Sequence, residues 1–194
     1  MNRAVAIMAG ALTILLLAFI ILVMIPSVNV AGDPPPKGLK PYTKQEMRGR
    51  DVYIANGCLY CHSQQVRDNI WSTDEARGWG RPSVSGDYYY DNPHLLGTMR
   101  TGPDLINVGV RQPSDTWHLI HLYQPRAVVA DSIMPGYPFL FEEVNEAKDD
   151  DVTVSLPPQF APDGKTVVAT QEALDLVAYL KSLKRDYPLE KELK

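Results

Sequence analysis

The stretch NGCLYCHSQQVR (residues 56–67) decides how this sequence is interpreted, because it contains both cysteines of the chain. Two residues separate Cys58 from Cys61, and His62 follows directly. A disulfide across so short a loop would constrain the unfolded chain very little. A structural zinc site takes four protein ligands, usually as two paired elements, and the sequence has no second Cys-x-x-Cys pair. A thioredoxin-like redox pair opens a helix, whereas a predicted helix precedes this pair.

The pattern Cys-x-x-Cys-His is the signature of covalent haem attachment. In such sites each thiol adds to one haem vinyl group, and the adjacent histidine binds the iron axially. We therefore predict one haem c, attached through Cys58 and Cys61, with His62 as the proximal iron ligand. The zinc and redox-pair interpretations are the less favoured alternatives.

An electron-transfer haem needs a sixth iron ligand, and a thioether sulfur raises the haem potential relative to a second histidine. We favour Met134, because the prolines of SIMPGYPF (132–139) would stiffen the loop that holds it. Met99, in the segment LLGTMRTGPDL, is the alternative. The other candidates, which we expect to serve in packing, are Met47, His94, His118 and His121.

The N-terminal segment from Ala4 to Ile25 contains 22 residues without a charge. A helix of this length spans about 33 Å, enough to cross a hydrocarbon core of about 30 Å. A cleaved signal peptide has a shorter apolar region, of about 7–15 residues, so we predict an uncleaved membrane anchor. Arg3 favours a cytoplasmic N-terminus. The haem domain should then lie on the periplasmic side of a bacterial inner membrane, where haem c is attached.

The chain has 194 residues, a formal net charge of −4 and 45% apolar residues, which suits one globular domain with an anchor and disfavours nucleic-acid binding. We expect an anchor at 1–27 and a stiff Pro-rich spacer at 28–42. The haem domain should occupy 43–188, with an acidic and hairpin insertion at 141–169, and a tail at 189–194 follows.

Within this domain the sequence predicts mainly helices joined by long loops. Thr43 and Glu46 form a capping box, so a helix should run from there to Gly57. Shorter signals predict a helix over 114–123 and a final helix over 170–188. VTVSL (152–156) and KTVVA (165–169) predict a small β-hairpin. The aromatic-rich segment 63–100 should be an ordered loop, and the acidic run 142–151 a solvated insertion or, alternatively, a docking patch for a basic donor.

The layout of these features resembles class I cytochromes c. The resemblance rests on Gly49 and Tyr53 in the first helix, the CLYCH motif, the pair Gly102-Pro103, a Met-Pro loop and the final helix LDLVAYLKSL. In that family the proline carbonyl accepts a hydrogen bond from the proximal histidine. The resemblance therefore implies that Pro103 orients the His62 ring.

Several segments are similar to a narrower group, the membrane-anchored mono-haem cytochrome c subunit (subunit II) of cbb3-type cytochrome c oxidases. These segments are GCLYCHSQQVR, SGDYYYDNPHLLGTMRTGPDL, WHLIHLYQPR and DSIMPGYPFL. The resemblance implies a non-catalytic subunit that relays electrons from a periplasmic donor or a sister cytochrome c subunit to a catalytic haem–copper subunit, where oxygen is reduced. The loop 63–100 would contact the partner, and Arg67 would lie near the haem propionates or the partner; a solvated Arg67 is the alternative. An independent membrane-tethered electron shuttle and the small subunit of a nitric oxide reductase are the competing functions.

Overall fold

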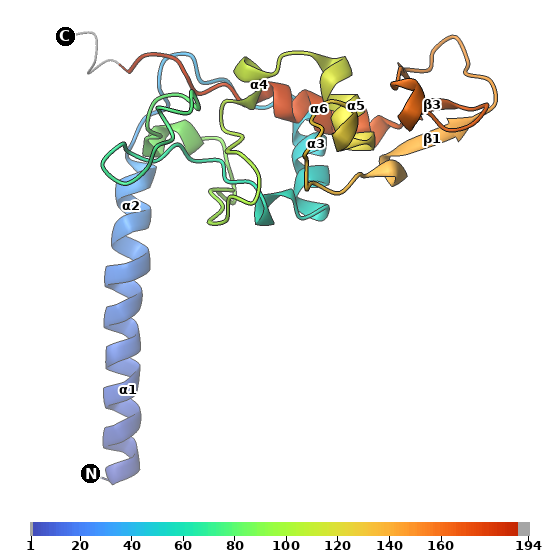
Figure 1. Cartoon of the computed structure of the whole chain (residues 1–194). Coiled ribbons are helices and arrows are strands. Elements are labelled where there is room, and N and C mark those ends of the chain that lie inside the picture. Colours follow the sequence, from blue (N-terminus) through green and yellow to red (C-terminus); the bar gives the residue numbers. More distant parts are fainter. Residues whose placement is uncertain (1, 190–194) are drawn as a thin grey trace.

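The computed structural model describes residues 2–189 and shows a mainly helical domain joined to one long N-terminal helix (Figure 1). Of the predicted tail 189–194, all but the first residue lies outside the described residues. The long helix comprises α1 (Arg3–Phe19), a π-helical turn (Ile20–Met24) and α2 (Ile25–Ala31). The π-helical turn precedes Pro26, whose ring and missing N–H do not fit a regular α-helical interior.

This helix is long and apolar enough to cross a membrane, and none of its apolar side chains is buried against the domain. It continues to Ala31, so the first residues of the predicted spacer are helical. Beyond it, the spacer packs on the domain: Ser85 donates a hydrogen bond to the Asp33 carboxylate, and a Cβ at Gly86 would lie 2.7 Å from the Pro34 carbonyl oxygen. The loop around residue 85 therefore holds the domain against the end of the anchor.

Two crossed helices, α3 (Lys44–Ala55) and α6 (Gln171–Ser182), form the centre of the core. The predicted start of α3 is confirmed, because both hydrogen bonds of the Thr43–Glu46 capping box are present. At the crossing, a Cβ at Gly49 would lie 1.8 Å from the Asp175 carbonyl oxygen. The two helices can therefore approach this closely only with glycine at position 49. Tyr53 and Tyr179 meet edge to face there, with ring centroids 5.5 Å apart.

The helix α6 ends at Ser182, before the predicted boundary at residue 188. The helix ends there because the backbone that follows it forms hydrogen bonds with other segments of the chain. The Gly109 N–H donates to the Leu183 carbonyl oxygen at 3.0 Å, and the Arg185 N–H donates to the Asn107 side chain. Two short helices, α4 (Val108–Arg111) and α5 (Asp115–Tyr123), pack beside α6, and α5 begins where the sequence predicted, with Ser114 as its N-cap.

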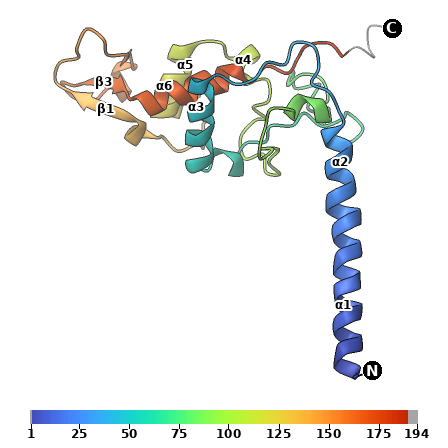
Figure 2. The same ribbon diagram turned by 180° about the vertical axis from the view of Figure 1, so that it is seen from behind.

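The domain contains one three-stranded sheet. Its strands β1 and β3 lie at the end of the domain far from α2 (Figures 1 and 2). The predicted pairing is confirmed, since β2 (Thr153–Val154) is antiparallel to β3 (Thr166–Ala169). A further strand, β1 (Phe141–Val144), pairs with the other edge of β3, so part of the acidic insertion belongs to a sheet. Phe141 is buried, whereas Glu142 and Glu143 are exposed. Because the segment is rich in acids, the sequence did not predict this strand.

Candidate haem site

The Cys-x-x-Cys-His motif forms a tight turn shortly after the end of α3. Gly57 adopts a left-handed conformation with φ of 68°, which ends the helix and starts a 3₁₀ turn at Cys58–Tyr60. The backbone N–H groups of Cys61 and His62 both donate to the Cys58 carbonyl oxygen, at 3.2 and 3.0 Å. This turn brings both thiols and the imidazole to the wall of one cavity.

The cavity has a volume of about 490 Å³ and is lined mainly by apolar side chains. Its walls come from α3, the motif, the segment 101–112, α5, the loop 129–137 and α6. Both cysteines are free thiols, and burial raises the pKa of Cys58 to about 11. Within residues 2–189, no group of three or more His, Cys, Asp and Glu side chains is placed to hold a metal ion, so the zinc alternative has no ligand set.

The His62 ring is held by the Gly102-Pro103 segment. Its Nδ1 lies 2.7 Å from the Pro103 carbonyl oxygen, and the Gly102 N–H donates to the Cys61 carbonyl oxygen at 2.9 Å. Burial lowers the pKa of His62, which favours the neutral imidazole that binds metal ions. This contact engages Nδ1 and does not involve the Nε2 atom of the ring.

Met134 lines the same cavity as the motif, whereas Met99 does not. Within the Met134 loop, the Met134 N–H donates to Ser132 Oγ at 3.3 Å. The loop is held to α5 by the Tyr137 N–H, which donates to the Leu122 carbonyl oxygen at 2.8 Å. Met99 is 59% exposed. Of the two predicted alternatives, the geometry therefore favours Met134.

The histidines of α5 also face this cavity. The Nε2 atom of His118 lies 2.8 Å from the Gln112 carbonyl oxygen, which assigns this ring a packing role. His121 stacks on Trp117 with ring centroids 4.6 Å apart, and burial lowers its pKa to about 4. His94, by contrast, is exposed and lies near the Tyr88 ring.

Three buried side-chain polar atoms in the described part of the chain have no hydrogen-bond partner, and all three belong to residues that line the cavity. They are Tyr53 Oη, Arg111 Nε and His121 Nδ1. Buried polar groups are almost always hydrogen-bonded in folded proteins. Unpaired atoms gathered around one apolar cavity, beside two thiols, an oriented imidazole and a thioether, fit a large apolar ligand with a few polar groups. Haem has this character.

The residues after the motif fold away from the cavity into a polar network. Asp104 accepts hydrogen bonds from Ser63 Oγ at 2.6 Å and from the Gln65 N–H at 2.7 Å. Arg100 binds Ser63 Oγ as well, and the Arg67 side chain donates to the Thr98 carbonyl oxygen at 3.3 Å. Sequence reasoning missed Asp104 and Arg100, although their position on either side of Thr101-Gly102-Pro103 could have suggested a role in placing that segment.

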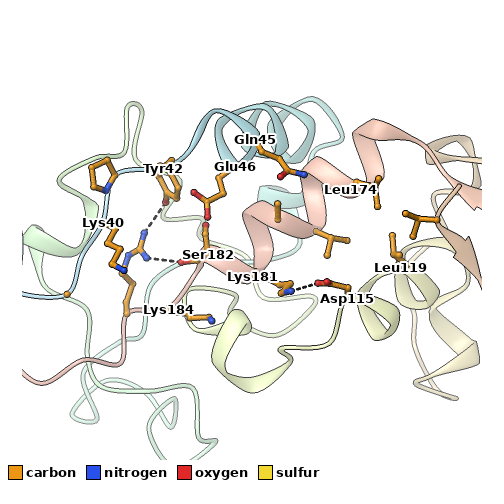
Figure 3. A pocket seen from close by; sticks show the side chains of 16 residues that line it. Lys40, Tyr42, Gln45, Glu46, Asp115, Leu119, Leu174, Lys181, Ser182 and Lys184 are labelled. Carbon is orange, nitrogen blue, oxygen red and sulfur yellow. Dashed lines mark hydrogen bonds and ion pairs between the residues drawn. The ribbon is translucent and has the colours of Figure 1, made fainter. Parts of the chain in front are cut away.

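A larger hollow, of about 780 Å³, lies on another part of the domain between residues 38–46 and α6 (Figure 3). Its walls include Lys40, Lys184 and Arg185, and Lys181 forms an ion pair with Asp115 there. None of the described residues that line it is a Cys, His or Met. This hollow therefore lacks the thiol, imidazole and thioether groups that line the smaller cavity.

Comparison with protein families agrees with this geometry. The family model described as cytochrome c oxidase, mono-haem subunit/FixO, matches residues 1–156. The chain belongs to this family. A comparison with curated proteins finds no match. As a member of the FixO family, the chain is a subunit of a membrane cytochrome oxidase complex with one haem and a catalytic subunit as partner, and its fold is a mainly helical cytochrome c domain with an N-terminal helix.

Proposed function

We propose that this protein is the electron-transfer subunit of a cbb3-type oxidase, relaying electrons through one covalently bound haem c to the catalytic haem–copper subunit. The observation that carries the proposal is the convergence of Cys58, Cys61, His62 and Met134 on one apolar cavity. FixO membership supports the oxidase context. The protein itself makes and breaks no substrate bonds; it receives electrons from a periplasmic donor or a further cytochrome c subunit.

The residues of the cavity suit this task. Cys58 and Cys61 would form the two thioether bonds, and Pro103 would keep the His62 ring oriented as the proximal ligand. Met134 would supply the sulfur ligand, which raises the potential. The bound haem would supply a one-electron iron centre. Apolar side chains at the back of the cavity, including Leu122, Leu176 and Leu180, would exclude water from it.

The orientation of the domain supports electron delivery toward the membrane. Figures 1 and 2 show that α3 runs with its C-terminal end, which leads into the motif, toward the side of the domain from which the anchor helix extends. Tyr60, within the motif, and Ile133, next to Met134, are 70% and 74% exposed. Exposed apolar residues at the site opening fit a protein partner such as the catalytic subunit.

The proposed organisation follows from this orientation. The anchor, which the sequence assigned to 1–27 and whose helix extends to Ala31, would cross the bacterial inner membrane once. The spacer 28–42 and the haem domain 43–188, with its insertion 141–169, would then lie on the periplasmic side. A membrane-tethered shuttle would have the same layout without permanent partners.

Two measurements test the proposal. Replacing Cys58 and Cys61 with Ser should abolish haem staining of the denatured protein on a gel, whereas haem that still stained would disprove covalent attachment at these residues. The unaltered protein, extracted in mild detergent, should co-purify with a polytopic protein that carries b-type haems and copper, and the complex should consume oxygen. Purification of the protein alone would favour a shuttle. Nitric oxide turnover without oxygen uptake would favour a nitric oxide reductase.

A further inference from the structure

The segment that follows the haem motif forms a compact loop whose two ends are tied together. The Ser83 N–H donates to the Val66 carbonyl oxygen at 2.9 Å, and the Val66 N–H donates to Ser83 Oγ at 3.0 Å. Surface loops of about 6–16 residues whose ends lie close together in this way are Ω-loops. Residues 67–82 therefore form an Ω-loop.

The two tryptophans of the Ω-loop are placed in opposite ways. Trp79 is 8% exposed and belongs to a small buried cluster with Val66. Trp71 and its neighbour Ile70 are 82% and 78% exposed, the highest values among the large apolar side chains of residues 2–189. Even the side chains of the membrane-spanning helix are less exposed. The Ω-loop thus presents an apolar pair, Ile70-Trp71, that the domain itself does not cover.

A tight turn holds this apolar pair. The Trp71 N–H donates to the Asp68 carbonyl oxygen at 2.9 Å, and the Ile70 N–H donates to the Asp68 carboxylate, also at 2.9 Å. Nearby, the buried Asp74 carboxylate accepts the Arg67 N–H at 2.8 Å. None of these bonds uses the side chain of Ile70 or Trp71. Both side chains therefore remain available to a surface outside this chain.

The Ω-loop lies at the end of the membrane anchor. Shortly after the loop, Ser85 donates a hydrogen bond to the Asp33 carboxylate, and a Cβ at Gly86 would lie 2.7 Å from the Pro34 carbonyl oxygen. Asp33 comes directly after the anchor helix and its C-cap, since the helix ends at Ala31. In Figures 1 and 2 the green loop lies level with the last turn of α2. The apolar pair therefore belongs to a loop held at the membrane side of the domain.

The length of the anchor determines where this level lies in a bilayer. A hydrocarbon core of about 30 Å takes up about 20 residues of a helix, which the uncharged run from Ala4 to Ile25 supplies. The helix continues over residues 26–31, which rise roughly 9 Å more at about 1.5 Å per residue. They cross the headgroup layer, which is about 5–7 Å thick on each side. The last turn of α2, and with it the Ω-loop, thus reaches the outer part of this layer.

We propose that Ile70 and Trp71 insert into the headgroup region of the lipid membrane and give the haem domain a second membrane contact beside its anchor. Tryptophan is enriched at membrane–water interfaces, because its ring is apolar and its N–H needs a polar partner. Neither Ile70 nor Trp71 lines the haem cavity. The exposed apolar residues at the opening of that cavity, Tyr60 and Ile133, remain available to the catalytic subunit. Two membrane contacts limit how far the domain tilts about its anchor.

Charge contributes little to this contact. Asp68 is exposed in the same turn, and its carboxylate would repel anionic lipids. Membrane insertion of the apolar pair therefore depends on the apolar area that it buries, and it should not require anionic lipid.

The experiment uses the whole oxidase complex in vesicles of phosphatidylcholine, a zwitterionic lipid. The photoreactive residue p-benzoylphenylalanine replaces Trp71 or, in a second variant, Ile70. On illumination this residue bonds covalently to the molecule beside it, and mass spectrometry of the digested subunit identifies that molecule. We expect phospholipid adducts at both positions. Their yield should stay the same when phosphatidylglycerol, an anionic lipid, is added to the vesicles.

Two control positions carry the same photoreactive residue. In place of Leu15, which is 65% exposed in α1, it should form lipid adducts. In place of Val110, which is 43% exposed in α4, it should form none, because α4 lies on the side of the domain away from the anchor (Figures 1 and 2). Assembly with the catalytic subunit confirms that each variant is folded.

Two outcomes would overturn the inference. Adducts that join position 70 or 71 to another subunit, without lipid adducts, would assign the apolar pair to the partner contact that the sequence suggested for this loop. The absence of any adduct at both positions, while position 15 still bonds to lipid, would show that the pair faces water.

Discussion

The Nδ1 atom of His62 lies 2.7 Å from the carbonyl oxygen of Pro103, and the neighbouring Gly102 packs directly against the same imidazole. A Cβ at position 102 would lie 2.2 Å from His62 Cε1. The backbone of Gly102 does not have a positive φ, so this glycine is required by space alone. The Gly102-Pro103 pair is thus a rigid cradle for the ring.

Replacing Gly102 with Ala should displace the His62 ring and weaken its bond to iron. Changes to the outer partners of a metal ligand typically lower metal affinity or activity by about 10–100-fold. We expect covalent haem to remain, with a loss of low-spin absorbance and an electron-transfer rate lowered on the order of 10-fold. The control is Gly32→Ala, where the added Cβ meets only an ordinary contact of 3.4 Å. An unchanged spectrum in Gly102→Ala would show that the cradle is not needed.

Replacing Met134 with Leu should lower the midpoint potential and remove the absorption band that arises from sulfur-to-iron bonding, because the haem would lose its thioether ligand. The matched control is Met99→Leu, which alters an exposed methionine outside the cavity and should leave both properties unchanged. If Met99→Leu alone removed the band, the axial ligand would have to be reassigned to Met99.

Replacing Gly49 with Ala should destabilise the domain without altering the haem ligands. The added Cβ would meet the backbone of α6 at 1.8 Å, and backbone atoms cannot rotate away as a side chain can. Overpacking of this kind costs about 1–3 kcal/mol and sometimes more. Urea unfolding should show a loss of roughly 3 kcal/mol, whereas Met47→Ala, on the part of α3 that is less buried, should stay within about 0.5 kcal/mol.

Much of the molecule could be predicted because its signals are local. The Thr43–Glu46 capping box fixed the start of α3, and the β-branched run 165–169 identified β3. The CLYCH motif predicted a haem site, and in the structure its two thiols and its imidazole line one apolar cavity. Met134 could be ranked above Met99 from its prolines, and the cavity agrees with that ranking.

The missed features depend on contacts between distant segments. The end of α6 is set by Asn107 and Gly109, which bind the backbone of residues 183–185, and no local signal marks that event. The SQQVR segment indicated the family, yet its physical role is to enter a buried network around Asp104 and Arg100. Likewise, Arg111 gave no sequence signal, because only the folded cavity shows that its Nε is unpaired.

The ion pair between Asp74 and Arg100 should make the stability of the long loop depend on pH. Asp74 is 1% exposed, and Arg100 Nη1 lies 2.5 Å from its carboxylate, which also accepts the Arg67 N–H at 2.8 Å. Burial opposes ionisation of Asp74, but the hydrogen bonds and charge of Arg100 outweigh it and hold its pKa below the ordinary value. Asp74 therefore binds a proton less readily in the folded state than in the unfolded state.

This stabilisation should be fully present above the unfolded pKa of about 3.9 and should be lost as the pH falls through the lower folded pKa. Asp74→Asn should flatten the decline in unfolding free energy below about pH 4. At neutral pH it should cost about 1–3 kcal/mol, because the partly buried Arg100 would lose its shortest ion pair and keep only the longer one to Asp104, at 3.7 Å. Urea unfolding over this pH range measures both effects. The control is Asp163→Asn, an exposed carboxylate at the turn before β3, which should change neither. An Asp74→Asn protein with the same acid sensitivity as the unaltered chain would assign that sensitivity to other carboxylates.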